Sequence, residues 1–144
     1  MARYALERIP AAEAGAALRD ALGKVSGTLK VGVISSLGVR GDDENVAAIA
    51  KELGDSDPAV SKAAAHGLGA IRTDAAAKAL ASAKTSAENQ AAVADAKLAC
   101  AESILAAGNN KEALTIYKSL VGADLPKHVK LAATRGMLAC AGKK

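Results

Sequence analysis

Residues 54–71, GDSDPAVSKAAAHGLGAI, contain the most sharply defined helix of the chain. Asp57 followed by Pro58 is typical of a helix N-terminus, because the carboxylate can cap free backbone N–H groups and proline tolerates the first helical position. The alanine run favours helix, but Gly67 and Gly69 each cost about 1 kcal/mol relative to alanine in a helix interior. We expect close approach of a neighbouring helix backbone to offset that cost.

The composition predicts one all-α domain over residues 1–144. Hydrophobic residues make up 51% of the chain, 37 of its residues are alanine, and there is no Trp or Phe. Alanine is the strongest helix former, and a small-residue core requires helices to pack at short range. No window of 18 apolar residues occurs, so we expect no membrane helix.

A repeat runs through the chain. Leu6, Leu37 and Leu68 are spaced 31 residues apart, Leu105 follows 37 residues later, and Leu138 another 33. Each copy has the pattern of helix, short turn, helix. The spacing therefore predicts about four and a half helix-turn-helix repeats with eight to nine helices.

Two series of helices are expected from the boundary signals. The outer series covers 2–9, 27–39, 58–71, 87–107 and 126–140, and the inner series covers 11–23, 43–53, 74–83 and 110–121. Asp42 and Asp74 suit helix N-termini, and Thr85 with Glu88 fits a capping box. Helix ends are expected at Gly41, Gly54, Gly108 and Gly122. Mid-helix Gly32 and Gly38, like Gly67 and Gly69, predict close helix packing.

The 31-residue unit, its D-P start and the outer-helix pattern A-x-x-x-L-G-x-I resemble HEAT-like repeats, most closely the short PBS-lyase type. The resemblance implies a right-handed α-solenoid that serves as a protein-interaction scaffold. Residues 107–120, AGNNKEALTIYKSL, instead resemble the second helix of a tetratricopeptide repeat. Such hybrid modules resemble parts of large multidomain bacterial proteins. ARYALERIP at the start already resembles the end of a helix, so we expect a fragment of a larger protein.

The residues do not point to catalysis or to a cofactor. His66 and His128 are the only histidines, and neither has a second His or a Cys at metal-ligand spacing. Asp42, Asp43 and Glu44 are consecutive, unlike the distributed ligands of a calcium loop, and fit a solvated helix start. We therefore expect a non-enzymatic domain without metal or cofactor.

The candidate interaction surface follows from helical periodicity. The inner helices of a stack line its concave face, and the charged residues expected there are Glu13, Arg19, Lys51, Glu52, Lys78, Lys111, Glu112 and Lys118. A second basic cluster, Lys127, His128 and Lys130, opens the last outer helix. Because positive charge there opposes the helix dipole, this cluster favours an acidic partner or an anion.

Two other function classes stay open. A nucleic-acid-binding solenoid could use Arg8, Arg40 and Arg72, which recur every 32 residues. Residues 1–72 carry no net charge, however, and aromatic residues for base stacking are lacking, so we consider nucleic acid an unlikely partner. The other class is an accessory domain of a larger bacterial enzyme, whose partners would be other domains of the parent chain.

The ends and the cysteines give two further expectations. Apolar residues at the first and last helices predict self-association through the solenoid ends: Tyr4, Leu6, Ile9, Val129, Leu131 and Met137. Cys100 lies five residues before Leu105, whereas Cys140 lies two after Leu138. If those leucines are equivalent, the cysteines are about 10 Å apart along the helix axes, too far for a disulfide. We therefore expect two free thiols.

Overall fold

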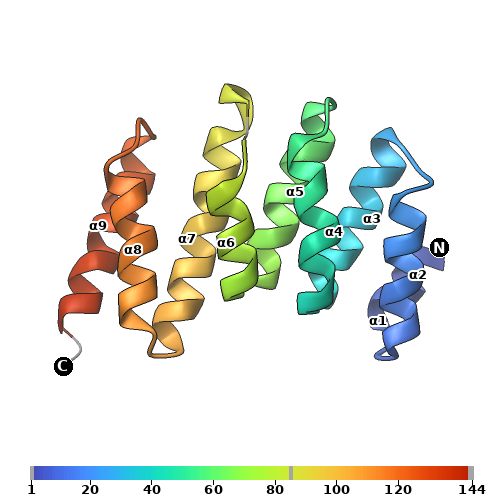
Figure 1. Ribbon diagram of the computed structural model, residues 1–144, viewed down its shortest axis with the longest axis horizontal. Coiled ribbons are helices and arrows are strands. Elements are labelled where there is room, and N and C mark those ends of the chain that lie inside the picture. The colour runs from blue at the N-terminus through green and yellow to red at the C-terminus, as the bar shows by residue number, and fades with distance from the viewer. Residues whose placement is uncertain (1, 85, 143–144) are drawn as a thin grey trace.

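The computed structural model describes residues 2–84 and 86–142, and this part of the chain contains nine α-helices, three short 3-10 turns and no strand (Figure 1). The α-helices are α1 (Ala2–Arg8), α2 (Ala12–Leu22), α3 (Gly27–Arg40), α4 (Val46–Lys51), α5 (Pro58–Ile71), α6 (Asp74–Ser82), α7 (Gln90–Ala106), α8 (Asn110–Val121) and α9 (Lys127–Gly142). The 3-10 turns are η1 (Asp43–Asn45), η2 (Glu52–Gly54) and η3 (Ala87–Asn89).

The helices form two layers that run along the length of the molecule. In Figure 1, α2, α4, α6 and α8 lie in front, and the first helices of the pairs lie behind them. The strongest contacts join α3 to α5, α5 to α7 and α8 to α9. This arrangement confirms the prediction of an all-α solenoid. The predicted segment 43–53 is divided into η1, α4 and η2, and 87–107 begins with η3.

Most of the expected helix boundaries are found, some with different capping groups. The Asp57 carboxylate accepts a hydrogen bond from the Ala59 N–H (2.9 Å), so α5 begins as predicted. At α6 the cap is Thr73, whose Oγ1 accepts from the Ala76 N–H (3.3 Å), and Asp74 lies in the first turn. Asp42 makes no capping bond and instead accepts from Arg40 Nε (2.8 Å). The predicted capping box depends on Thr85, which lies outside the described residues.

The repeated leucines are fully buried only in α3 and α5, and Leu6 in α1 is half-buried against the core. Leu37 and Leu68 are fully buried, whereas Leu105 is half-buried and the Leu138 side chain is 69% exposed. Leu138 is therefore not equivalent to Leu37 and Leu68 in its burial. The buried residues of α9 are Val129, Ala133 and Cys140. Leu138 falls on another face of α9, and no helix pair follows in the described part to cover that face.

Three of the four mid-helix glycines lie at close contacts between helices. A Cβ on Gly38 would lie 2.9 Å from the Gly67 Cα, and a Cβ on Gly69 would lie 2.9 Å from the Ala96 Cα. The backbones of α3, α5 and α7 thus touch at successive crossings, as predicted. Gly32 differs because it faces a side chain: Arg3 Nη1 donates to the Gly32 carbonyl oxygen (2.9 Å).

A further close contact, at Gly136 in α9, was not anticipated from the sequence. The Tyr117 side chain of α8 is 1% exposed and is the largest buried side chain. A Cβ on Gly136 would overlap the Tyr117 ring. Because Gly136 has no side chain, the Tyr117 ring, the one aromatic group of the core, fits against α9.

Replacing Gly38 by alanine tests the α3–α5 contact. Alanine is intrinsically better in a helix by about 1 kcal/mol, but its methyl group would push against the Gly67 backbone, which cannot rotate away. We expect Gly38→Ala to lower the free energy of unfolding by about 1–3 kcal/mol in urea titrations. Gly23→Ala is the matched control, since Gly23 has right-handed backbone angles and its nearest neighbour is 3.8 Å from the added Cβ. Equal stability of the two variants would contradict the contact.

The pairing of Tyr117 with Gly136 predicts that two substitutions compensate. Gly136→Ala alone should destabilise the protein by about 3 kcal/mol or more, because the ring must leave its site. Tyr117→Leu removes the ring and leaves a cavity, which also costs stability. In the double variant the methyl group occupies part of that cavity, so its unfolding free energy should exceed the additive value by about 1 kcal/mol or more. Strict additivity would show that the two residues do not share this space.

Candidate interaction surface

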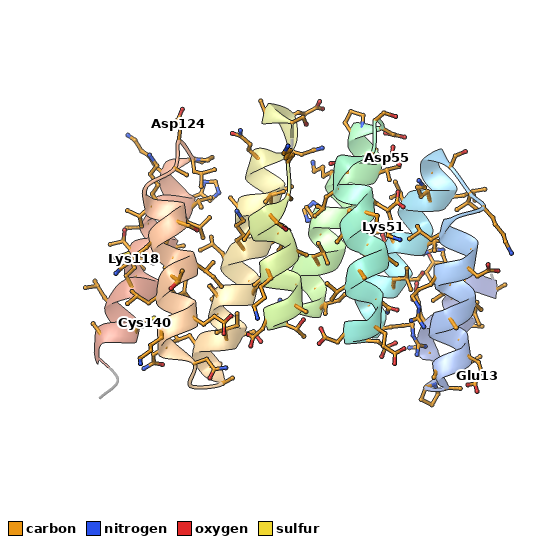
Figure 2. The ribbon with its side chains drawn as sticks, viewed as in Figure 1. Glu13, Lys51, Asp55, Lys118, Asp124 and Cys140 are labelled. Atoms are coloured by element: carbon orange, nitrogen blue, oxygen red, sulfur yellow. The ribbon has the colours of Figure 1, made fainter. Side chains whose placement is uncertain are left out.

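Several residues of the predicted surface lie exposed on the front layer. Glu13 on α2, Lys51 on α4 and Lys118 on α8 are exposed, and Figure 2 shows them on three different helices of this layer. None of the three has an ion-pair partner among residues 2–84 and 86–142. Their charges are available to a partner molecule.

A weak ion pair joins the two front-layer helices α6 and α8. Lys78 Nζ on α6 lies 4.0 Å from Glu112 Oε1 on α8, with the lysine side chain 75% exposed. An exposed pair at this distance contributes little to stability. Lys111, beside Glu112 at the start of α8, is exposed as well.

Arg19 and Glu52 bind side chains of their own chain. Arg19 Nη1 donates to Asn45 Oδ1 (2.7 Å), and the fully buried Asn45 in turn donates to the Leu37 carbonyl oxygen (3.1 Å). Glu52 accepts from Lys30 Nζ (2.7 Å), with both side chains less than one-fifth exposed. The Arg19 contact joins the first helix pair to the second, and the Glu52 contact joins the turn after α4 to α3 of the same pair. The two residues therefore serve packing more than recognition.

Lys30 also binds a second carboxylate, that of Asp55 (2.9 Å). Hydrogen bonds to Glu52 and then to Asp55 raise the pKa of Lys30. The pKa of Asp55 is lowered, first by the hydrogen bond from the Asp57 N–H and then by Lys30. Asp55, labelled in Figure 2, lies at the turn that leads into α5.

The basic cluster of α9 lies on the other layer, apart from the front-layer lysines. Lys127 and His128 are exposed and Lys130 is half-buried. His128 Nε2 lies 3.9 Å from Asp95 Oδ1 on α7, and both side chains are more than half exposed. His66 is exposed, and together with Arg72 and Asp95 it borders a shallow groove between α5 and α7.

The arginine series does not form a row of free cations. The Arg40 side chain is only 5% exposed and binds the end of α1: Nη1 donates to the carbonyl oxygens of Leu6 (2.8 Å) and Ile9 (2.6 Å). Arg8 and Arg72 are exposed. Arg40, the middle residue of this series, therefore stabilises the fold and is not free to bind a nucleic acid.

The acidic trio at the start of η1 is divided among three different partners. Asp42 accepts from Arg40, Asp43 accepts from Thr73 Oγ1 (2.6 Å), and Glu44 accepts from Arg19 Nη2 (3.3 Å). In the described part of the chain, no three His, Cys, Asp or Glu residues come together as metal ligands.

None of the helices formed by residues 2–84 and 86–142 is long and apolar enough to cross a membrane.

The structure reveals a cleft that sequence reasoning missed. It has a volume of about 290 Å³ and lies between the end of α6, the first half of α7 and the end of α8. Its lining includes Gln90, Val93, Ala94 and Lys97, which occupy one face of α7. Burial lowers the pKa of the half-buried Lys97 ammonium. In the sequence these four residues are spaced at positions 0, 3, 4 and 7, so they share one helix face, and the first and last of them are polar. This pattern could have indicated the cleft-lining face of α7 from the sequence alone.

A two-layer stack of helix pairs with a small-residue core and an open charged face defines an α-solenoid repeat protein. The family model for HEAT repeats matches residues 15–101, which is more than half of the chain and runs from α2 into α7. The chain therefore belongs to the HEAT repeat family. No curated protein matches it. The helices α8 and α9 lie beyond the matched residues, in the part where the repeat is longer.

The two cysteines are free thiols, as expected. Cys100 is fully buried on α7, and its Sγ lies 3.9 Å from the Leu68 carbonyl oxygen. Burial raises the pKa of the Cys100 thiol from 9.0 to about 11, with a smaller opposite effect of Arg72. The register argument behind the expectation assumed that Leu105 and Leu138 are equivalent, but Leu105 is half-buried and Leu138 is exposed.

The raised pKa of Cys100 predicts a specific pH dependence of stability. Because the folded state holds the thiol proton more tightly than the unfolded state, this contribution is complete below pH 9 and is lost as pH rises toward about 11. Urea titrations across that range should show a steeper loss of stability for the native protein than for Cys100→Ala. Cys140→Ala, which keeps Cys100, should follow the native slope. Parallel curves for the native protein and Cys100→Ala would contradict the assignment.

Proposed function

We propose that the chain is a non-catalytic protein-interaction or scaffold module that presents its front layer to a partner protein. The observation that carries this proposal is the row of exposed charged side chains on successive front-layer helices, Lys51, Lys78 and Lys118 among them. A rigid stack holds these charges at fixed spacing, which favours specificity and rapid encounter with an acidic surface.

Membership of the HEAT repeat family supports the proposal, since such repeats generally mediate protein interactions. The partner is either a separate protein or another domain of a parent chain, and an accessory role beside a bacterial catalytic domain fits the same surface. Nucleic acid is a weaker candidate, because the side chain of Arg40 is committed to α1.

The apolar residues at the two ends support self-association as an additional property. Tyr4 is 57% exposed at the first helix, and Leu131 and Leu138 are 55% and 69% exposed on α9. Val129, counted among the exposed end residues in the sequence, is fully buried, and Met137 is half-buried. The end surface of α9 is thus centred on the two leucines, which are seven residues apart on one helix face.

Charge reversal on the front layer tests the interaction function. The double variant Lys78→Glu/Lys118→Glu should lose a partner that the native protein and the control Lys62→Glu both capture from cells that express the chain. Lys62 is exposed on α5, in the other layer. The captured protein, once purified, should bind the double variant about tenfold more weakly in calorimetry, with unchanged thermal stability of the variant.

Capture that is equal for all three proteins would contradict the proposed face. Capture that disappears after nuclease treatment, with a steep fall in affinity as salt is added, would instead support the nucleic-acid alternative.

A further inference from the structure

The cleft described above exists because α6 and α8 are set apart. Figure 1 shows α7 visible between them, whereas the neighbouring front helices α4 and α6 pack against each other. The packing of α8 is dominated by α7 and α9. One face of α7 therefore forms the floor of an open cleft on the front layer.

The walls of this cleft combine an apolar interior with a few polar groups. Val93, Leu120 and Leu125 supply apolar surface, and Gln90 and Ser119 supply an amide and a hydroxyl group. Its volume of about 290 Å³ far exceeds the roughly 30 Å³ occupied by a water molecule. The space is large enough for a side chain and its neighbours.

Among residues 2–84 and 86–142, Lys97 is the one cation that lines this cleft. No hydrogen bond or ion pair joins it to any other residue within the described part of the chain. The other charged residue of the lining in the described part is Asp124, at the tip of the turn after α8 (Figure 2), and it forms no ion pair with Lys97. A half-buried ammonium without a counter-ion has lost hydration that no protein group replaces.

We propose that this cleft binds an acidic side chain of a partner polypeptide, with the carboxylate on Lys97 and adjacent apolar atoms against Val93, Leu120 and Leu125. A carboxylate supplies the missing counter-ion through a charge-assisted hydrogen bond, and Gln90 and Ser119 are further donors at the cleft. Lys78 on α6 and Lys118 on α8 belong to the two helices that border it, and their positive charge favours an acidic segment.

A polypeptide is the expected source of the carboxylate because the cleft lies on the face proposed for partner binding. The identity of the ligand as a polypeptide rests on that proposed function, but the binding residues are those of the cleft, above all Lys97.

The proposed binding should also depend on pH. Burial lowers the pKa of free Lys97, and a bound carboxylate raises it again, so affinity should fall as pH rises through the pKa of the free lysine.

Two capped tripeptides test the proposal, acetyl-Leu-Glu-Leu-amide and its glutamine counterpart, titrated into the protein with the Lys97 ε-methylene signal followed by NMR. We expect the glutamate peptide to bind roughly tenfold more tightly than the glutamine peptide and to raise the pKa of Lys97. Lys97→Met should abolish this preference, Lys97→Arg should retain it, and Asp124→Asn should strengthen binding by removing a like charge. Thermal unfolding of each variant checks that the fold persists.

Several outcomes would overturn the proposal. Equal affinity for the two peptides, or no binding at millimolar concentration, would show that Lys97 does not recognise a carboxylate. A further fall in the pKa of Lys97 in Asp124→Asn, without peptide binding, would show that Asp124 is its partner in solution. Glutarate binding as tightly as the glutamate peptide would make the cleft a small-anion site. The peptides test the cleft alone, whereas the Lys78→Glu/Lys118→Glu experiment tests the interaction function. A negative peptide result would therefore overturn the cleft proposal without deciding the proposed function.

Discussion

The contact between the backbones of α3 and α5 is the constraint on which the rest of the stack depends. Gly38 has no room for a methyl group against the Gly67 backbone, and one helix further on Gly69 has none against Ala96. Leucine, isoleucine and valine side chains then fill the space between the two layers around these crossings. A core so rich in alanine gains its cohesion from many short contacts, because each small side chain buries little surface.

In the C-terminal part, α8 and α9 pack closely through a different kind of residue pair. There the Tyr117 ring of α8 occupies the space above Gly136 of α9. A large ring against a glycine replaces two helix backbones in contact, and α8 is held mainly between α7 and α9. This change of packing mode accompanies the longer fourth repeat, the separation of α8 from α6 and the cleft that contains Lys97.

The helix pairs and the close glycine contacts could be predicted because both depend on local signals. Asp57 and Pro58 define a helix start within a few residues, and the cost of Gly67 and Gly69 in a helix indicates a compensating contact. The candidate surface was harder to predict. Arg19 and Glu52 share the periodicity of exposed residues, but their contacts with Asn45 and Lys30 depend on how helices more than 20 residues apart in the sequence are placed. Leu138 matches the repeat but lies on an exposed face of α9, and Lys97 lines a cleft whose walls come from helices that are distant in sequence.

The attachment of α1 has a consequence for how the stack opens. This helix has no fully buried residue, and Leu6 is its one residue packed against the core. Polar groups also hold it to α3: Arg40 binds the carbonyl oxygens of Leu6 and of Ile9 just after the helix, and Arg3 reaches Gly32 and Ser36. Detachment of α1 would break polar contacts but expose little apolar area. The denaturant dependence of that step is consequently small compared with that of global unfolding. Amide hydrogen exchange in α1 should therefore proceed by a local opening that urea hardly accelerates, while the amides of α5 exchange only when the whole stack unfolds.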